Sequence, residues 1–123
     1  MAKYVDGFVI PIPKKNTSMY KKMAQDGRRT WMKFGALDYK ECILDDAKPP
    51  FITFTFAKAA RLRPKEAVWF SFIVFRSRKH RVAVNKKVHA YFEKKYGTGA
   101  MQEMPFDMKR VAYGGFRVVV DAK

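Results

Sequence analysis

An acidic residue, Asp6, lies in the middle of an apolar run near the start of the chain, between Tyr4 and Phe8. If these alternate residues point into the space between two sheets, water is excluded from the carboxylate, which then serves as a proton acceptor or as the anchor of a polar ligand. The structural alternative is an ion pair with Arg110 or another cation on a neighbouring strand, because buried charges are normally paired. Either interpretation places the carboxylate inside the molecule.

A second group of polar residues lies near the end of the chain, where Asp107 follows Pro105. Proline pre-sets a turn, and an aspartate in a turn commonly fixes it by accepting hydrogen bonds from backbone amides. The functional alternative is that Asp107, Arg110 and Tyr113 surround the mouth of a pocket. Tyr113 would then orient a polar ligand, because its ring is apolar and its hydroxyl forms hydrogen bonds.

Several kinds of chemistry find no support in the sequence. Cys42 is the only cysteine, so the chain forms no internal disulfide and no cysteine-based zinc site, and we expect Cys42 to be a small core residue. His80 and His89 are nine residues apart, half a turn out of phase on a helix, so they cannot bind one metal ion from the same face. Catalytic triads, phosphate-binding glycine loops and dinucleotide fingerprints are missing as well. The sequence therefore predicts no metal and no cofactor, and it assigns no enzymatic reaction.

Basic residues are strongly in excess: 26 Lys and Arg against 11 Asp and Glu give a net charge of +15. Most of this excess lies on two predicted helices, whose outer sides should form a cationic surface. Such a surface binds phosphate backbones without sequence preference. The alternative is a solvated surface, because no aromatic residues lie between the exposed charges, as stacking on single strands requires. The candidates for polyanion binding are Lys21, Lys22, Arg28, Arg29, Arg78, Arg81, Lys86 and Lys87.

Hydrophobic periodicity predicts the elements that position these side chains. The run Val68–Phe75 is apolar on both faces, which is typical of an interior strand covered on both sides. The predicted elements, in order, are a strand at Tyr4–Ile12, a helix from Asn16–Ser18 to Phe34 ended by Gly35, a strand at Ala36–Leu44, an extra strand or hairpin arm at Phe51–Phe56, a strand at Ala67–Phe75, a helix capped by Ser77 and ended at Tyr96–Gly99, a loop at Met101–Lys109 and a strand at Val111–Val120.

This order of strands and helices predicts a fold. Strand, helix, strand, repeated, is the split βαβ arrangement: a ferredoxin-like α+β fold with an antiparallel sheet and two helices on one face. A chain of 123 residues supports one such domain, residues 1–123. Because no third helix remains to cover the other face, we expect a second copy to cover it, giving a homodimer of the α/β-barrel type.

The apolar stretches are far shorter than the roughly 20 residues that cross a bilayer, and no secretory signal precedes the first strand. We therefore expect a cytoplasmic protein that makes no membrane contact.

Segments at both ends and in the middle of the chain carry a family resemblance: Tyr4–Val9, Val68–Ile73, Met104–Asp107, Lys109-Arg110 and Tyr113–Phe116. Together they resemble the YbaA-like family of small bacterial proteins of unknown function, over nearly the whole length. The resemblance implies a dimeric α/β-barrel fold and a bacterial origin, and it implies no catalytic residue.

Two hypotheses of function follow. In the first, the sheets of a homodimer enclose an apolar pocket lined by Phe8, Phe72 and Tyr113, with Asp6 as its polar group. In the second, the basic helix faces bind nucleic acid or another polyanion without sequence preference.

Overall fold

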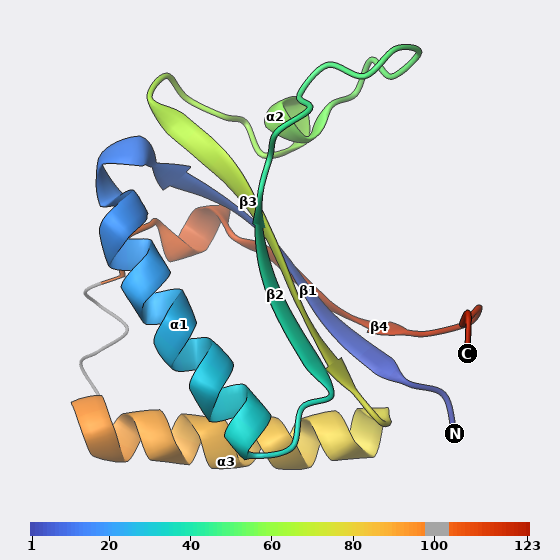
Figure 1. Ribbon diagram of the computed structural model, residues 1–123. Coiled ribbons are helices and arrows are strands. Elements are labelled where there is room, and N and C mark those ends of the chain that lie inside the picture. The colour runs from blue at the N-terminus through green and yellow to red at the C-terminus, as the bar shows by residue number, and fades with distance from the viewer. Residues whose placement is uncertain (98–103) are drawn as a thin grey trace.

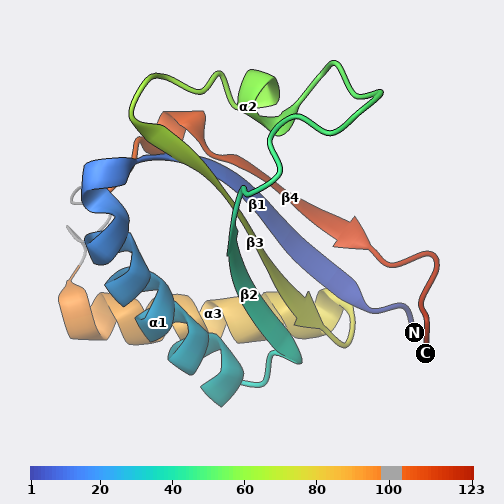
Figure 2. The same ribbon diagram turned by 45° about the horizontal axis from the view of Figure 1, so that its top comes forward.

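The computed structural model describes residues 1–97 and 104–123, and its central feature is one antiparallel sheet. The elements are β1 (Tyr4–Pro13), a 3-10 helix (Lys14–Asn16), α1 (Thr17–Lys33), β2 (Asp38–Ile43), α2 (Phe56–Ala59), β3 (Glu66–Phe75), α3 (Arg78–Tyr96), a second 3-10 helix (Met108–Arg110) and β4 (Ala112–Arg117). The strand order is β2-β3-β1-β4. Helices α1 and α3 cross on one face of the sheet and leave its other face open (Figure 1, Figure 2). The predicted ferredoxin-like α+β fold is therefore confirmed.

The two central strands form the longest ladder, in which Tyr4 pairs with Phe75 and Pro13 with Glu66. The prolines of β1 do not disturb the sheet. β4 pairs with β1 only as far as Val9, so Pro11 and Pro13 lie beyond it, where β1 is an edge and a missing N–H breaks no ladder.

The last strand is shorter than the predicted Val111–Val120, because its partner ends first. Tyr4, the first residue of β1, pairs with Arg117, the last residue of β4. One further hydrogen bond, from the Val118 amide to the Lys3 carbonyl, closes the ladder. The apolar residues that follow have no strand to pair with, and Val119 and Val120 are exposed.

The helix-facing side of the sheet holds the core, which consists of two clusters. Trp31 packs against one of them and Trp69 belongs to the other. The first cluster contains Tyr4, Ala36, Ile73, Phe75, Val84 and Val88, and the second contains Ile10, Ile12, Tyr20, Ala24 and Trp69. Helix α1 approaches β2 closely at Gly27, where a Cβ would lie 2.9 Å from the Tyr39 hydroxyl. Close helix–sheet packing therefore depends on this glycine.

The helix ends agree in part with the sequence prediction. The Ser77 hydroxyl caps α3 by accepting a hydrogen bond from the His80 amide at 3.0 Å. Gly35 follows α1 with φ 113°, a conformation that glycine adopts readily. Asn16 occupies the N-cap position of α1 but makes no capping bond. Its amide instead donates to the Pro105 carbonyl, which ties the closing segment to the start of α1.

The predicted strand or hairpin arm at Phe51–Phe56 is wrong. After β2 the chain leaves the sheet and forms an extension, residues 44–65, that carries the short helix α2 beyond one end of the sheet (Figure 1). Phe51 has φ 69°, outside the strand region, and Thr55 caps α2 through the Lys58 amide. Aromatic and β-branched residues favour a strand only where a neighbouring strand can pair, and none is available here.

Three other expectations need correction or qualification. Cys42 is exposed on the edge strand β2 and is not a core residue. The spacing in the sequence groups Val82, Asn85, Val88, His89 and Phe92 near one face of this helix, but the buried residues of α3 are Val84 and Val88, and Val82 is 54% exposed. The predicted loop Met101–Lys109 begins outside the described residues and ends in the second 3-10 helix.

Among the described residues, none of the helices is both long enough and apolar enough to span a bilayer.

The Ser77 cap gives a stability prediction. Replacing Ser77 by Ala removes the capping bond and should lower the free energy of unfolding by about 1 kcal/mol. Ser18→Ala is the control, because Ser18 is an exposed residue in the first turn of α1, where no side-chain cap is formed. Urea denaturation measures both variants. Equal midpoints for the two would contradict the assignment of Ser77 as a cap.

Candidate functional site

The sheet register separates the residues expected to line one pocket. Phe72 pairs with Gly7, which places its side chain on the open face. Asp6, Phe8 and Tyr113 lie on the opposite, helix-facing side, since Phe8 pairs with Tyr113 and neighbouring residues of a strand alternate between faces. Asp6 therefore cannot be the polar group of a pocket that Phe72 lines.

The Asp6 carboxylate is 2% exposed and lies at the centre of a hydrogen-bond network between sheet and helix. One oxygen accepts from Arg81 Nε at 2.9 Å and from the Tyr113 hydroxyl at 3.1 Å, and the other accepts from Asn85 Nδ2 at 3.0 Å. The Asn85 oxygen in turn accepts from Trp31 Nε1 at 2.9 Å. We call these five residues the Asp6 network. The three donors to the carboxylate therefore come from α3 and β4, and Trp31 connects the network to α1.

The ion pair of Asp6 differs from the expected one. Its partner, Arg81, comes from helix α3 and not from a neighbouring strand. The Arg81 side chain is only 18% exposed, so it does not belong with the free cations proposed to bind polyanions. Burial and the negative charge of Asp6 raise the pKa of the Tyr113 hydroxyl, which stays protonated and donates to the carboxylate. The Asp6 carboxylate is therefore hydrogen-bonded through both oxygens and buried, whereas Tyr113 is 52% exposed at the edge of the network.

The residues near Tyr113 in sequence have local partners. Arg110 forms a bidentate ion pair with Glu66, at 2.6 and 2.9 Å, and these hydrogen bonds lower the pKa of Glu66. Asp107 accepts a hydrogen bond from the Lys109 amide at 2.9 Å, which is the predicted turn role. The structure therefore does not bring Asp107, Arg110 and Tyr113 together around one opening.

A buried acid that the sequence analysis did not single out is Glu41 on β2. Its two oxygens accept hydrogen bonds from the hydroxyls of Tyr20, at 2.6 Å, and Tyr39, at 2.7 Å. Burial raises the pKa of Glu41, because no cation contacts the carboxylate and the two hydrogen bonds compensate only in part. The signal was present in the sequence, since Tyr39 and Glu41 share a strand face that is otherwise apolar.

The open face of the sheet is the side that carries Phe70, Phe72 and Phe116. The Phe70 and Phe72 rings are 5.7 Å apart, and Phe116 is 61% exposed. Between Val68 and Val74, and on the paired residues of β1 and β4, the described part of this face carries no charged side chain. At its β2 edge the face carries Asp38 and Lys40, which form an ion pair, and the remainder is apolar. It is therefore an apolar surface uncovered within one chain.

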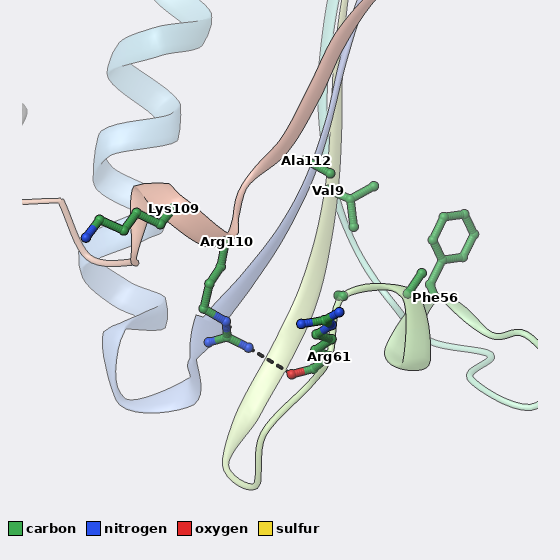
Figure 3. A pocket seen from close by; sticks show the side chains of 8 residues that line it. Val9, Phe56, Arg61, Lys109, Arg110 and Ala112 are labelled. Atoms are coloured by element: carbon green, nitrogen blue, oxygen red, sulfur yellow. Dashed lines mark hydrogen bonds between the residues drawn. The ribbon is translucent and has the colours of Figure 1, made fainter.

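A cavity of about 360 Å³ lies where the open face meets the extension. Its apolar wall includes Val9 of β1, Ala112 of β4 and Phe56 of α2, and Arg61 and Arg110 also line it. Figure 3 shows the Arg110 guanidinium turned toward Arg61, with Phe56 on the far side of Arg61 and the Lys109 side chain extending away. Of the residues predicted to line a pocket, only Arg110 takes part.

The basic candidates on the helices are mostly free of partners inside the fold. Lys21, Lys22, Arg28 and Arg29 on α1 are all exposed, and only Arg29 lies near an acid, 3.6 Å from Asp26. On α3, Arg78, Lys86 and Lys87 are exposed as well. The cationic surface predicted from the sequence is thus present apart from Arg81. Among the described residues, no three His, Cys, Asp or Glu side chains gather as a metal site would require.

The sheet, the helix layer and the open apolar face define a ferredoxin-like α+β protein. The family model DUF1428, which is described as a protein of unknown function, matches residues 3–108. The chain belongs to this family. The chain is 37% identical over 120 residues to the uncharacterized protein YbaA of Escherichia coli K12, covering 97% of this chain and 98% of that protein, and YbaA of Shigella flexneri matches equally. The YbaA-like resemblance is confirmed.

Among solved structures, a dimeric ferredoxin-like protein from an uncultured marine organism superimposes with a TM-score of 0.60 at 10% sequence identity. The match covers 99% of this chain and 100% of that one. At this identity the likeness concerns the fold alone.

Two adjacent glycines of β4 provide a test of the Asp6 network. A Cβ at Gly115 would lie 2.6 Å from both Arg81 Nη2 and the Tyr4 hydroxyl, so Gly115→Ala should displace Arg81 and cost about 1–3 kcal/mol of unfolding free energy. A Cβ at Gly114 would meet only Phe116, at an ordinary 3.6 Å, so Gly114→Ala should change stability by less than about 0.5 kcal/mol. Thermal unfolding of both variants checks this. A Gly114 variant as unstable as the Gly115 variant would contradict it.

Proposed function

We propose that the chain acts as a homodimer that binds a small ligand at the open face of its sheet. The observation that carries this proposal is the apolar surface that β1, β3 and β4 form on the open face, which runs into a cavity of about 360 Å³ under the extension. The site lies on the side of the sheet away from Asp6. Asp6, Phe8 and Tyr113, which the sequence analysis placed in the pocket, therefore do not line it. A cavity of this size is at the small end of known ligand pockets.

Electrostatics favours the open face as the surface where two copies meet. Each chain carries a net charge of +15, so two copies repel one another at most orientations. Contact through Phe70, Phe72 and Phe116 removes apolar surface from water. The charged side chains beside them on this face, Lys40 and Asp38 of β2, form an ion pair with each other at 3.0 Å and add no net charge. The fold neighbour from the marine organism is described as dimeric, which supports a dimer of this chain.

A dimer formed through the open face would also cover part of the cavity. Val9 and Ala112 belong both to the open face and to the cavity wall. A second copy seated on the open face would therefore cover the side of the cavity that the extension leaves open, and would exclude water from a bound ligand.

Substitution on the open face tests the proposal. Phe70 is 43% exposed, and Phe70→Asp places a charge in the proposed interface. Native mass spectrometry and sedimentation should find wild type as a dimer at micromolar concentration and this variant as a monomer. Val82→Asp is the matched control, because Val82 is 54% exposed on α3, away from the open face, and this variant should remain a dimer. A well-folded wild-type monomer under these conditions would rule the proposal out.

The second candidate function is nonspecific binding of nucleic acid by the helix surface. It is favoured by one observation: the cations of α1 and α3 named above are exposed and lie on the outer layer of the molecule. Counterion release by phosphates would drive such binding and make it strongly dependent on salt.

This alternative predicts a steep salt dependence. If six phosphates are engaged, affinity for a random DNA duplex should fall about a thousandfold between 50 and 200 mM salt. Replacing Lys21, Lys22, Arg28 and Arg29 by Gln should flatten the log–log salt slope by about three to four units, at about 0.9 per phosphate. The matched control replaces four exposed cations of the extension, Lys48, Lys58, Arg63 and Lys65. Equal effects of the two sets, or no binding by wild type at 50 mM salt, would exclude the helix surface as a binding site.

A further inference from the structure

One cation of the cavity is held in a backbone conformation that glycine would adopt more easily. Arg61 has φ 51°, in the left-handed region. Its amide donates to the Lys58 carbonyl at 3.0 Å, and the Leu62 amide donates to the Ala57 carbonyl at 2.9 Å. This is the hydrogen-bond pattern of a Schellman motif, in which the left-handed position after the helix is usually glycine. An arginine at this position costs backbone strain, and strained residues cluster at binding sites.

The neighbouring arginine fixes this position without supplying free charge. Arg110 is neutralised by its bidentate ion pair with Glu66. The same guanidinium donates from Nη2 to the Arg61 carbonyl at 3.0 Å, as the dashed line in Figure 3 marks. Arg61 itself takes part in none of the ion pairs formed among the described residues. The cavity is therefore lined by one neutralised cation, Arg110, and by two cations without an ion pair among the described residues, Arg61 and Lys109, of which Lys109 extends away from the cavity (Figure 3).

Apart from Lys109, the rest of the wall is apolar, with Val9, Ala112 and Phe56 around Arg61. A single cation beside apolar side chains suits a ligand that has a negative group at one end and a hydrocarbon part at the other. We infer that the cavity binds a small amphipathic anion, with its carboxylate on Arg61 and its tail against Phe56 and Val9. This inference rests on the proposed function and names the ligand class of the same site.

Three probes separate charge from apolar contact: octanoate, octan-1-ol and acetate. Octan-1-ol has the hydrocarbon tail without the carboxylate, acetate has the carboxylate without the tail, and octanoate has both. Amide chemical shifts of the 15N-labelled protein report binding at each residue. We expect octanoate to shift the amides of Val9, Arg61 and Ala112 with saturation, and the other two probes to bind at least tenfold more weakly.

Two glycine substitutions supply a matched pair of variants. Arg61→Gly removes the charge from the cavity and relieves the left-handed strain. Lys65→Gly removes a charge from the same extension and relieves the same kind of strain, because Lys65 has φ 65° but does not line the cavity. Both variants should melt at or above the wild-type temperature. Octanoate should bind the first at least tenfold more weakly than wild type, and the second within twofold of wild type.

The outcomes distinguish this inference from the proposal beneath it. If octan-1-ol shifts the same amides as strongly as octanoate, or if the two glycine variants lose octanoate equally, the cavity binds ligands but the anionic class is wrong. If none of the probes shifts any amide of the cavity, the inference fails. If in addition wild type is a monomer, the proposed function fails with it.

Discussion

The burial of one carboxylate, that of Asp6, sets the relation between the two layers of this protein. An ionised carboxylate removed from water must be paired, and losing one partner of such a pair typically costs about 3–5 kcal/mol. Arg81 and Asn85 supply the partners from α3, and Tyr113 supplies a third from β4. Because each donor has one productive position, α3 cannot slide along the sheet without breaking the network. The absence of a side chain at Gly115 leaves the room that Arg81 and Tyr4 occupy.

The two faces of the sheet are consequently used in different ways. On the helix-facing side the two buried carboxylates are matched, Asp6 by its network and Glu41 by two tyrosine hydroxyls, whereas the buried indole N–H of Trp69 has no partner among the described residues. On the open face the central strands offer only apolar side chains, and the polar groups lie at the margin, where Arg61 and Arg110 meet the cavity. The interactions that stabilise the fold are concentrated on the helix-facing side of the sheet, and exposed apolar side chains on the open side. The segments that resemble the family contribute to both sides, with Asp6, Tyr113 and Gly115 on the first and Phe72 and Phe116 on the second.

Much of the fold was predictable from the sequence because helices and strands each impose a period on the apolar residues. In α1, for example, the spacing of Tyr20, Ala24 and Gly27 in the sequence groups three residues that are buried in the structure. Sequence alone does not give the offset between two strands, however, so it could not show that Phe8 and Phe72 point to opposite sides. The partner of Asp6 was missed for a similar reason: Arg81 lies 75 residues away on a helix whose rotation depends on tertiary packing. Residues Phe51–Phe56 have strand composition, but strand formation requires a neighbour with which to pair.

The division of the core into two clusters also distributes the optical reporters of the molecule. Trp31 packs against one cluster and donates its indole N–H to Asn85, so its emission depends on the polar junction around Asp6. Trp69 belongs to the other cluster, 5.0 Å from the Tyr20 ring, in apolar surroundings. Each core cluster thus has one tryptophan in it or packed against it, and the two indole rings lie in environments of different polarity. Replacing either tryptophan by phenylalanine leaves a chain whose fluorescence follows the loosening of one cluster, so the order in which the two halves come apart is open to direct observation.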